Sequence, residues 1–199
     1  MKQKRVSDSQ AEKPSNTLFS VDLRIYKKEA FMIALRITDI KKMMQILLYS
    51  SSFDSFSMQE VSVLKDISFF LEGRLHPDYF TTEDLDTYPE LRTRTFARWG
   101  EYREHIAAFI QGDRTPLSFK FVLQAPESYM QKLLTSQDFT ADPSLVKSLI
   151  LTFRYENDIL TCLTGTAFTT FVPDKSLDGL WDRAIRKSLE NMQIGYEEM

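Results

Sequence analysis

Residues 117–124 carry the sequence pattern that most constrains the fold. Large apolar side chains occupy every second position of this segment: Leu117, Phe119, Phe121 and Leu123. Successive side chains of a β-strand point to opposite faces of a sheet, so such alternation is typical of a strand with one buried face. The segment therefore predicts a sheet that packs against a core on one side.

Other segments supply further strands. Residues 33–37 alternate in the same way, 58–71 are rich in Val, Ile and Phe, and 149–156 are joined to the extended segment 159–172 by Asn157-Asp158. Asn and Asp tolerate positive φ, so this dipeptide predicts a tight hairpin turn. The segment 58–71 fits either one long strand or a hairpin.

Apolar stripes at helical spacing lie between these strand segments. They predict helices at 40–48, 96–111 and 126–134, a short helix from Asp142-Pro143, and a long C-terminal amphipathic helix that carries Leu177, Leu180, Trp181, Ile185 and Leu189. Strands clustered by hairpin-length links, with helices between the clusters, favour a single α+β domain. We expect a mostly antiparallel sheet with the helices packed on it.

Composition limits the functional classes. The chain of 199 residues is 43% apolar, which is enough for the core of one domain. The single Cys162 excludes an intramolecular disulfide, and two histidines leave little for a metal centre. No long apolar segment predicts a membrane span or a secretory signal, so we expect a cytoplasmic protein without membrane contact, metal or other cofactor.

Residues 1–31 differ from the rest of the chain. The first fourteen are polar and charged, and we expect residues 1–31 to be disordered or a mis-annotated extension before a domain at 32–199. Lys28-Glu29-Ala30 permits the codons AAG-GAG-GCN, which contain a ribosome-binding sequence shortly before Met32. This segment holds seven of the 25 basic and four of the 28 acidic residues, so the body retains 18 basic and 24 acidic residues, a net charge of −6.

One group of residues has the composition of an anion site. Arg94, Arg98 and Arg103 surround Trp99, and guanidinium groups beside aromatic rings can bind a phosphorylated ligand or single-stranded nucleic acid. A structural interpretation competes with this one, because Trp99 is needed for the apolar stripe of its helix. An acidic body also repels polyanions. We keep Arg94, Arg98, Trp99 and Arg103 as candidate binding residues and call them the arginine group.

The remaining candidates are weaker. Glu101 and His105 have the spacing of two metal ligands on a helix, His76 lies among loop carboxylates, and Cys162 needs a base to act as a nucleophile. A solvated ion pair, a solvated loop and a buried thiol explain these features more simply. Gly-rich phosphate loops, dinucleotide fingerprints and the common hydrolase motifs are not found in the sequence, so no catalytic residue is assigned.

Several segments also suggest a family. These are the segment from Met32 to Lys42, Arg114 to Lys120, Leu160 to Thr166, Asp174 to Leu177, and Trp181-Asp182. Over the body from Met32 to the C-terminus, the chain resembles a clostridial and related bacterial family classed as a domain of unknown function, whose members begin at the equivalent of Met32. The resemblance implies a bacterial cytoplasmic protein and brings no activity or site residue.

Three functional hypotheses follow. The leading one is a small binding or interaction protein that is not an enzyme, with a protein partner or a small anionic ligand. The second is an enzyme that acts on a small anionic or phosphorylated substrate, with Arg98 and Arg103 as anion holders and His76 or His105 for proton transfer. The third is a nucleic-acid-binding accessory protein, which the acidic body disfavours.

Overall fold

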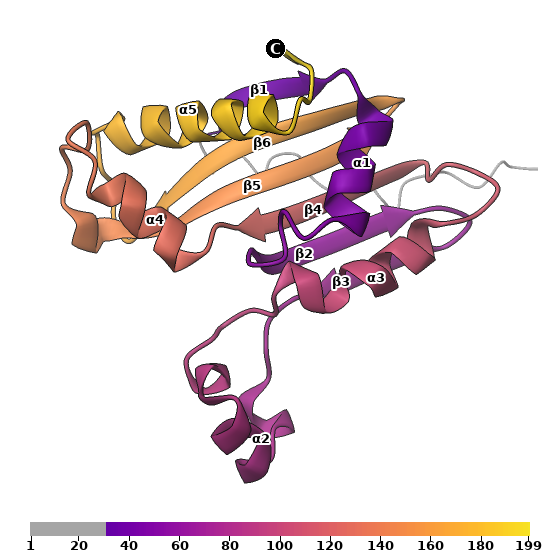
Figure 1. The fold of residues 1–199 in the computed structure, drawn as a ribbon, viewed down its shortest axis with the longest axis horizontal. Helices are drawn as coiled ribbons and strands as arrows, with labels where there is room; N and C mark the ends of the chain where they lie inside the picture. Colours follow the sequence, from indigo (N-terminus) through magenta and orange to yellow (C-terminus); the bar gives the residue numbers. More distant parts are fainter. Residues whose placement is uncertain (1–30) are drawn as a thin grey trace, which may run out of the picture.

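A seven-stranded antiparallel sheet forms the centre of the molecule. The computed structural model describes residues 31–199, and its strands are β1 (Phe31–Ile37), β2 (Ser57–Leu64), β3 (Ser68–Glu72), β4 (Ser118–Gln124), β5 (Val146–Glu156), β6 (Ile159–Phe168) and β7 (Tyr196–Glu198). They lie in the order β3-β2-β4-β5-β6-β1-β7 (Figure 1). Every neighbouring pair is antiparallel, which confirms the predicted sheet.

Helices connect the strands, as the sequence predicts. They are α1 (Ile40–Tyr49), α2 (Thr82–Thr87), α3 (Trp99–Ile110), α4 (Glu127–Leu134) and α5 (Ser176–Asn191), with short 3-10 turns at Pro77–Tyr79, Pro89–Arg92 and Pro143–Leu145. The single α+β domain and the C-terminal helix are confirmed. The expectations for residues 1–30 lie outside the described residues, and β1 begins at Phe31, one residue before the expected start of the domain.

Two turns show how local sequence set the strand pairing. Asn157 and Asp158 both have positive φ, at 51° and 61°, and join β5 to β6 in the predicted tight hairpin. The segment 58–71 is a hairpin rather than one strand, because residues 65–67 turn the chain between β2 and β3.

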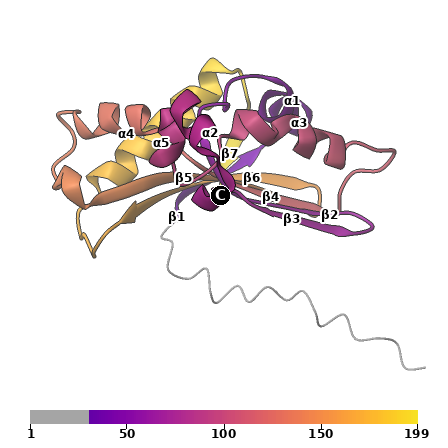
Figure 2. The same cartoon turned by 90° about the horizontal axis from the view of Figure 1, so that it is seen from below.

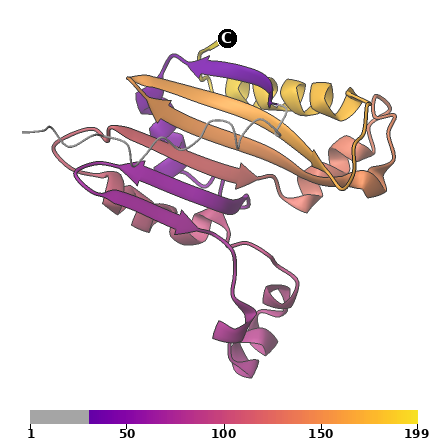
Figure 3. The same cartoon turned by 180° about the vertical axis from the view of Figure 1, so that it is seen from behind.

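The sheet has one covered face. Figure 2 shows α1, α3, α4 and α5 on the same side of the strands, and Figure 3 shows the opposite face, which no described helix covers. The alternating residues of β4 point to the covered face, where Phe121 and Leu123 are fully buried. The alternation of Phe119, Phe121 and Leu123 thus reports a sheet that packs on one side, whereas Leu117 lies before β4 and is 66% exposed.

The covering helices form two groups, each anchored by a tryptophan. In the first group α3 packs against α1, and the indole Nε1 of Trp99 donates to the Leu47 carbonyl at 2.7 Å. In the second group α5 packs beside α4, and Nε1 of Trp181 donates to the Ile150 carbonyl of β5 at 2.9 Å. Both indoles are fully buried, so each joins its helix group to the core.

Helix α5 also buries two carboxyl groups against β6. Thr164 Oγ1 donates to Asp182 at 2.6 Å, and Thr166 Oγ1 donates to Asp178 at 2.9 Å. Burial raises the pKa of Asp182 above its usual range. The threonines of β6, which have a high strand propensity, therefore also fix the position of α5.

Residues 74–96 form an arm that leaves the sheet between β3 and α3. The arm hangs below the sheet in Figure 1, and it contains α2 and two of the 3-10 turns. A bridge between Arg74 and Phe96 closes its root. None of its residues is buried, and Tyr79 is 83% exposed. Local hydrogen bonds hold the arm, such as the capping box of Thr81 and Asp84.

Candidate functional site

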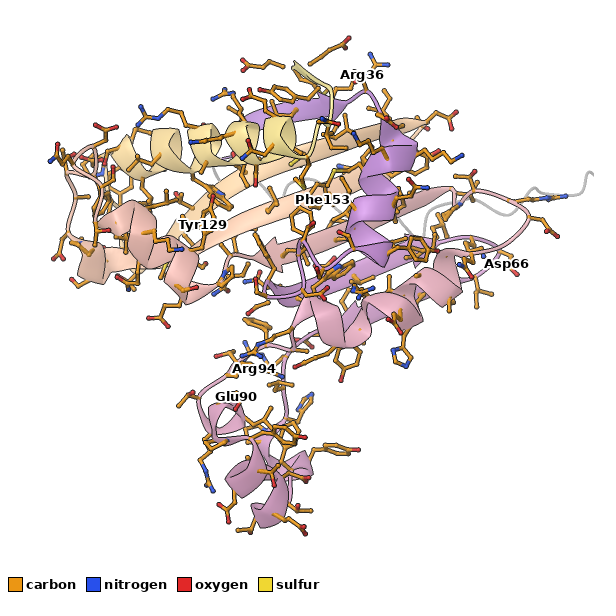
Figure 4. The ribbon with its side chains drawn as sticks, viewed as in Figure 1. Arg36, Asp66, Glu90, Arg94, Tyr129 and Phe153 are labelled. Atoms are coloured by element: carbon orange, nitrogen blue, oxygen red, sulfur yellow. The ribbon has the colours of Figure 1, made fainter. Side chains whose placement is uncertain are left out.

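The arginines of the predicted anion site are bound by carboxylates of the same chain. Arg94, at the root of the arm (Figure 4), forms a bidentate ion pair with Glu101, with N–O distances of 2.7 and 2.9 Å. Arg103 Nε donates to Asp54 at 2.7 Å, and its Nη1 donates to the Leu48 carbonyl at 3.3 Å. Their side chains are only 14% and 17% exposed, so neither guanidinium is open to a ligand.

The other two members of this group have different environments. Trp99 has an exposed fraction of 0%, so its ring cannot stack on a ligand. Arg98 is exposed, and its backbone N–H donates to Glu101 at 3.0 Å at the start of α3. The structure therefore brings Arg94 and Arg98 together at Glu101, directs Arg103 toward Asp54, and places Trp99 in the core.

A glycine explains why Asp54 comes so close to α3. A Cβ added at Gly100 would lie 2.7 Å from the Cβ of Asp54, which is closer than side-chain atoms pack. The missing side chain lets the loop after α1 lie directly on the first turn of α3. Asp54 then pairs with Arg103 and ties the loop to the helix.

The weaker candidates do not converge. His76 is exposed on the arm and His105 is exposed on α3, while Glu101 is paired with Arg94. No cluster of three potential metal ligands occurs among residues 31–199. Cys162 is fully buried, and burial raises the pKa of its thiol far above the usual range. The thiol is therefore neutral and unreactive at physiological pH.

A concave feature of a different kind lies between the two helix groups. It is a cleft of about 420 Å³, which lies within the usual size range of small-molecule sites. Its floor is the covered face of the sheet, with Leu151 and Phe153 from β5 and Cys162 from β6. Figure 4 shows Phe153 in the gap between the helix groups and Tyr129 on α4 at the side.

Aromatic contacts shape the walls of the cleft. Phe53, from the loop after α1, meets Phe153 edge to face with ring centroids 5.7 Å apart. Tyr129 meets Trp181 in the same way, also at 5.7 Å. Because α4 is short and begins only after Pro126, it covers one end of the sheet, and the cleft lies between Phe53 and Tyr129 above floor residues that are themselves buried.

Polar side chains from three elements line the cleft above this floor. Most of them form no side-chain hydrogen bond or ion pair with another residue of the described chain: Ser55, Ser128, Tyr129, Lys132, Ser188 and Asn191. Burial raises the pKa of the Tyr129 hydroxyl, which is therefore a neutral donor at physiological pH. Lys132 is the one charged residue among those lining the cleft.

These groups suit binding better than chemistry. The described lining contains no carboxylate and no histidine, so it offers no general base near neutral pH. It does combine an apolar floor with a few hydrogen-bonding groups that converge from α4, α5 and the loop after α1, as small-molecule sites do. The cleft is therefore the best candidate functional site of the described chain.

Sequence reasoning missed this site. Its only sequence signals are Ser188, which interrupts the apolar stripe of α5 beside Leu189, and Ser128 and Lys132 four residues apart on α4. Both patterns are common on the exposed side of any helix. The site exists because the tertiary structure brings α4, α5 and the loop after α1 around one part of the sheet.

A second, smaller groove of about 270 Å³ lies on the uncovered face, beside β3. Its charged groups neutralise each other, since Lys120 pairs with Glu60 at 2.8 Å and Arg74 pairs with Glu72 at 3.8 Å. Arg74 also lies over the ring of Phe96. This groove therefore has no obvious polar group left to bind a ligand.

The fold is that of a single-domain α+β protein, and its described part carries a cleft of small-molecule size beside the helices. The chain belongs to a family of unknown function, DUF5721, whose model matches residues 46–197. The residues that line the cleft all fall inside this matched segment. No curated protein and no solved structure matches the chain. Among the described helices, none is long and apolar enough to span a membrane.

Proposed function

We propose that this protein is a small-molecule binding protein that holds its ligand in the cleft between the two helix groups. The observation that carries this proposal is the set of unpaired polar side chains above an apolar floor. Most of these side chains are exposed, so a ligand that covers them removes them from water, and its polar groups would pair with them to offset the cost of that desolvation. The half-buried apolar side chains of the lining, such as Phe56 and Met192, would supply the hydrophobic part of the affinity.

The same proposal includes the cellular setting. We place the protein in the bacterial cytoplasm, as the family resemblance implies. A lone, buried and unpaired Cys162 is consistent with a reducing compartment.

The two alternative functions have less support. An enzyme that uses Arg98 and Arg103 as anion holders would need them beside His76 or His105, and Arg103 instead pairs with Asp54. Nucleic-acid binding through the arginine group would need an accessible stacking ring, and Trp99 is fully buried. Both alternatives would therefore have to use other residues.

The proposal is tested with N-phenyl-1-naphthylamine, an uncharged aromatic probe that fluoresces in apolar surroundings. We expect the native chain to bind it in a saturable way. Ser188→Trp and Ser128→Trp, which place an indole in the cleft from α5 and α4, should each weaken binding by roughly tenfold or more, because they occupy the volume of the probe. Fluorescence titration gives the affinities.

Lys187→Trp is the matched control, since Lys187 is exposed on α5 beside Ser188 and does not line the cleft. It should bind the probe as the parent does. Near-ultraviolet circular dichroism and thermal unfolding should show that each variant keeps its tertiary structure. Equal affinities in all three variants, or binding only by a partly unfolded chain, would reject the cleft as the site.

A further inference from the structure

We infer that the ligand of this cleft is a small amphipathic monoanion, with an apolar body on the floor and one acidic group held by Lys132. This inference rests on the proposed function and specifies its ligand class. A compact aromatic or aliphatic acid has the required chemistry.

Lys132 is the only charged group at the cleft, and it has no carboxylate partner within the described chain. This contrasts with Arg94 and Arg103, whose guanidiniums are held by Glu101 and Asp54. Helix α5 offers no such partner in the lining, since it contributes Ser188 and Asn191 as its polar groups there. A ligand anion would thus meet no competing carboxylate among the lining residues.

The position of Lys132 places its charge at the edge of the cleft. Lys132 is exposed in the last turn of α4, while Tyr129, one turn earlier on the same helix, is half-buried in the wall. Ser128 lies four residues before Lys132, so the two side chains share one side of α4. An acidic group at this edge can accept hydrogen bonds from both the ammonium and the hydroxyl while it stays in contact with water.

The deeper part of the cleft requires an apolar body. The side chains directly beneath the cleft are closed to water, whereas Phe56, Tyr129 and Met192 line it and are only half-buried, so they present its accessible apolar surface. A charged group placed there would lose its hydration without a partner. The ligand is therefore charged at one end only.

The net negative charge of residues 32–199 favours a ligand that carries a single negative charge. Residues 32–199 carry 18 basic and 24 acidic side chains, and a single lysine cannot offset the repulsion that this net charge exerts on a polyanion. A carboxylate or sulfonate carries one negative charge at neutral pH, whereas a phosphate ester carries nearly two. Among small anions, the cleft therefore favours monoanionic acids over phosphorylated compounds.

The test compares two probes with the same ring system. The probe 8-anilinonaphthalene-1-sulfonate carries one sulfonate, and N-phenyl-1-naphthylamine is the same molecule without it. We expect the parent chain to bind the sulfonate probe more tightly. Lys132→Met should weaken that binding by about fivefold and change the affinity for the neutral probe much less, because the charge-assisted contact is made only to the sulfonate.

Two further variants isolate the charge of Lys132. Lys132→Arg should retain the preference for the sulfonate, since it keeps the positive charge. Lys187→Met removes a lysine of α5 that does not line the cleft, and it should retain the preference as well. Raising the salt concentration should weaken binding of the sulfonate probe alone, as expected for an exposed charge pair.

The outcomes separate the two proposals. Equal binding of both probes, with no effect of Lys132→Met on either, would overturn the monoanion inference and leave a binding cleft for neutral ligands. Saturable binding of neither probe by the folded parent would reject the binding cleft itself. Loss of both probes in Lys132→Met, with an unchanged unfolding temperature, would show that Lys132 shapes the cleft rather than holds an anion, and would also overturn the inference.

Discussion

The arginine group lies in the first half of α3 and just before it, and the cleft lies between the helix groups. The two regions differ in whether their polar side chains already have partners within the chain. In the arginine group, Arg94 and Arg103 each pair with a carboxylate of the same chain, although the buried Nε of Arg94 has no hydrogen-bond partner in the described chain, and the indole N–H of Trp99 donates to a buried carbonyl. In the cleft, the Tyr129 hydroxyl and the Lys132 ammonium have no partner within the described residues. The arginine group has the residue types that are more typical of a binding site, but two of its guanidinium groups are already bound by carboxylates of the same chain.

This difference shows that residue type alone does not identify a binding site. Guanidinium groups beside aromatic rings are equally suited to holding two parts of a fold together, as Arg103 does when it ties the loop after α1 to α3. A site needs groups whose hydrogen bonds are left for the ligand. If the contrast is correct, substitutions of Trp99 and Arg103 should lower stability, and substitutions of the unpaired groups of the cleft should not.

Trp99→Ala should have the largest effect, with a loss of about 3–5 kcal/mol in the free energy of unfolding. The change removes a fully buried ring from the junction of α1 and α3 and leaves the Leu47 carbonyl without its partner. Urea denaturation followed by circular dichroism measures the loss. A change below about 1 kcal/mol would mean that the ring is not part of the core and would reopen a ligand role.

Arg103→Ala should have an intermediate effect, a loss of about 1–3 kcal/mol in the free energy of unfolding. The change leaves the half-buried Asp54 without its cation and removes the hydrogen bond to the Leu48 carbonyl. Urea denaturation of Arg103→Ala, of Asp54→Ala and of the double variant gives the coupling free energy between the two side chains. Arg98→Ala is the matched control. It should stay within about 0.5 kcal/mol of the parent, since the side chain is exposed.

A coupling free energy near zero between Arg103 and Asp54 would argue against the contrast between a paired arginine group and an unpaired cleft. It would mean that Arg103 is free to bind an anion in solution, as the sequence first suggested. A stability loss in Arg98→Ala as large as that of Arg103→Ala would also argue against the contrast, because the loss would then not depend on the ion pair between Arg103 and Asp54.

Tyr129→Phe should have the smallest effect, within about 0.5 kcal/mol of the parent, because its hydroxyl has no hydrogen-bond partner in the described chain. The ring contact with Trp181 is retained in the variant. Thermal and urea unfolding measure the difference. A loss above about 1 kcal/mol would show that the hydroxyl stabilises the fold, and it would remove Tyr129 from the groups available to a ligand.

Much of the fold was predictable from local patterns. The alternation at 117–124 predicts β4 and its buried side, the apolar stripe around Trp181 predicts α5, and Asn157-Asp158 predicts the hairpin turn. The order of the strands was not predictable in this way. Strand β1 lies between β6 and β7, far along the chain from both, and such pairing depends on which hydrophobic faces meet in space.

The candidate site was less predictable than the fold. The sequence places Arg94, Arg98, Trp99 and Arg103 close together along the chain. In the structure Trp99 and Arg103 lie on α3 and Arg98 is its N-cap, and a binding role for these residues stays a prediction. The sequence could not show that Glu101 and Asp54 would accept two of the guanidiniums, because Asp54 comes from a loop that lies beside α3 only in the folded chain.

The sequence by itself determined the class of the fold, the one-sided burial of the sheet and the acidic charge of the body, since each depends on local periodicity or on composition. Only the tertiary structure decided where a ligand could bind. Phe53, Tyr129, Phe153 and Ser188 come from four separate elements. Their meeting around one cleft depends on how two helix groups are placed on a sheet, and local sequence does not encode this long-range geometry.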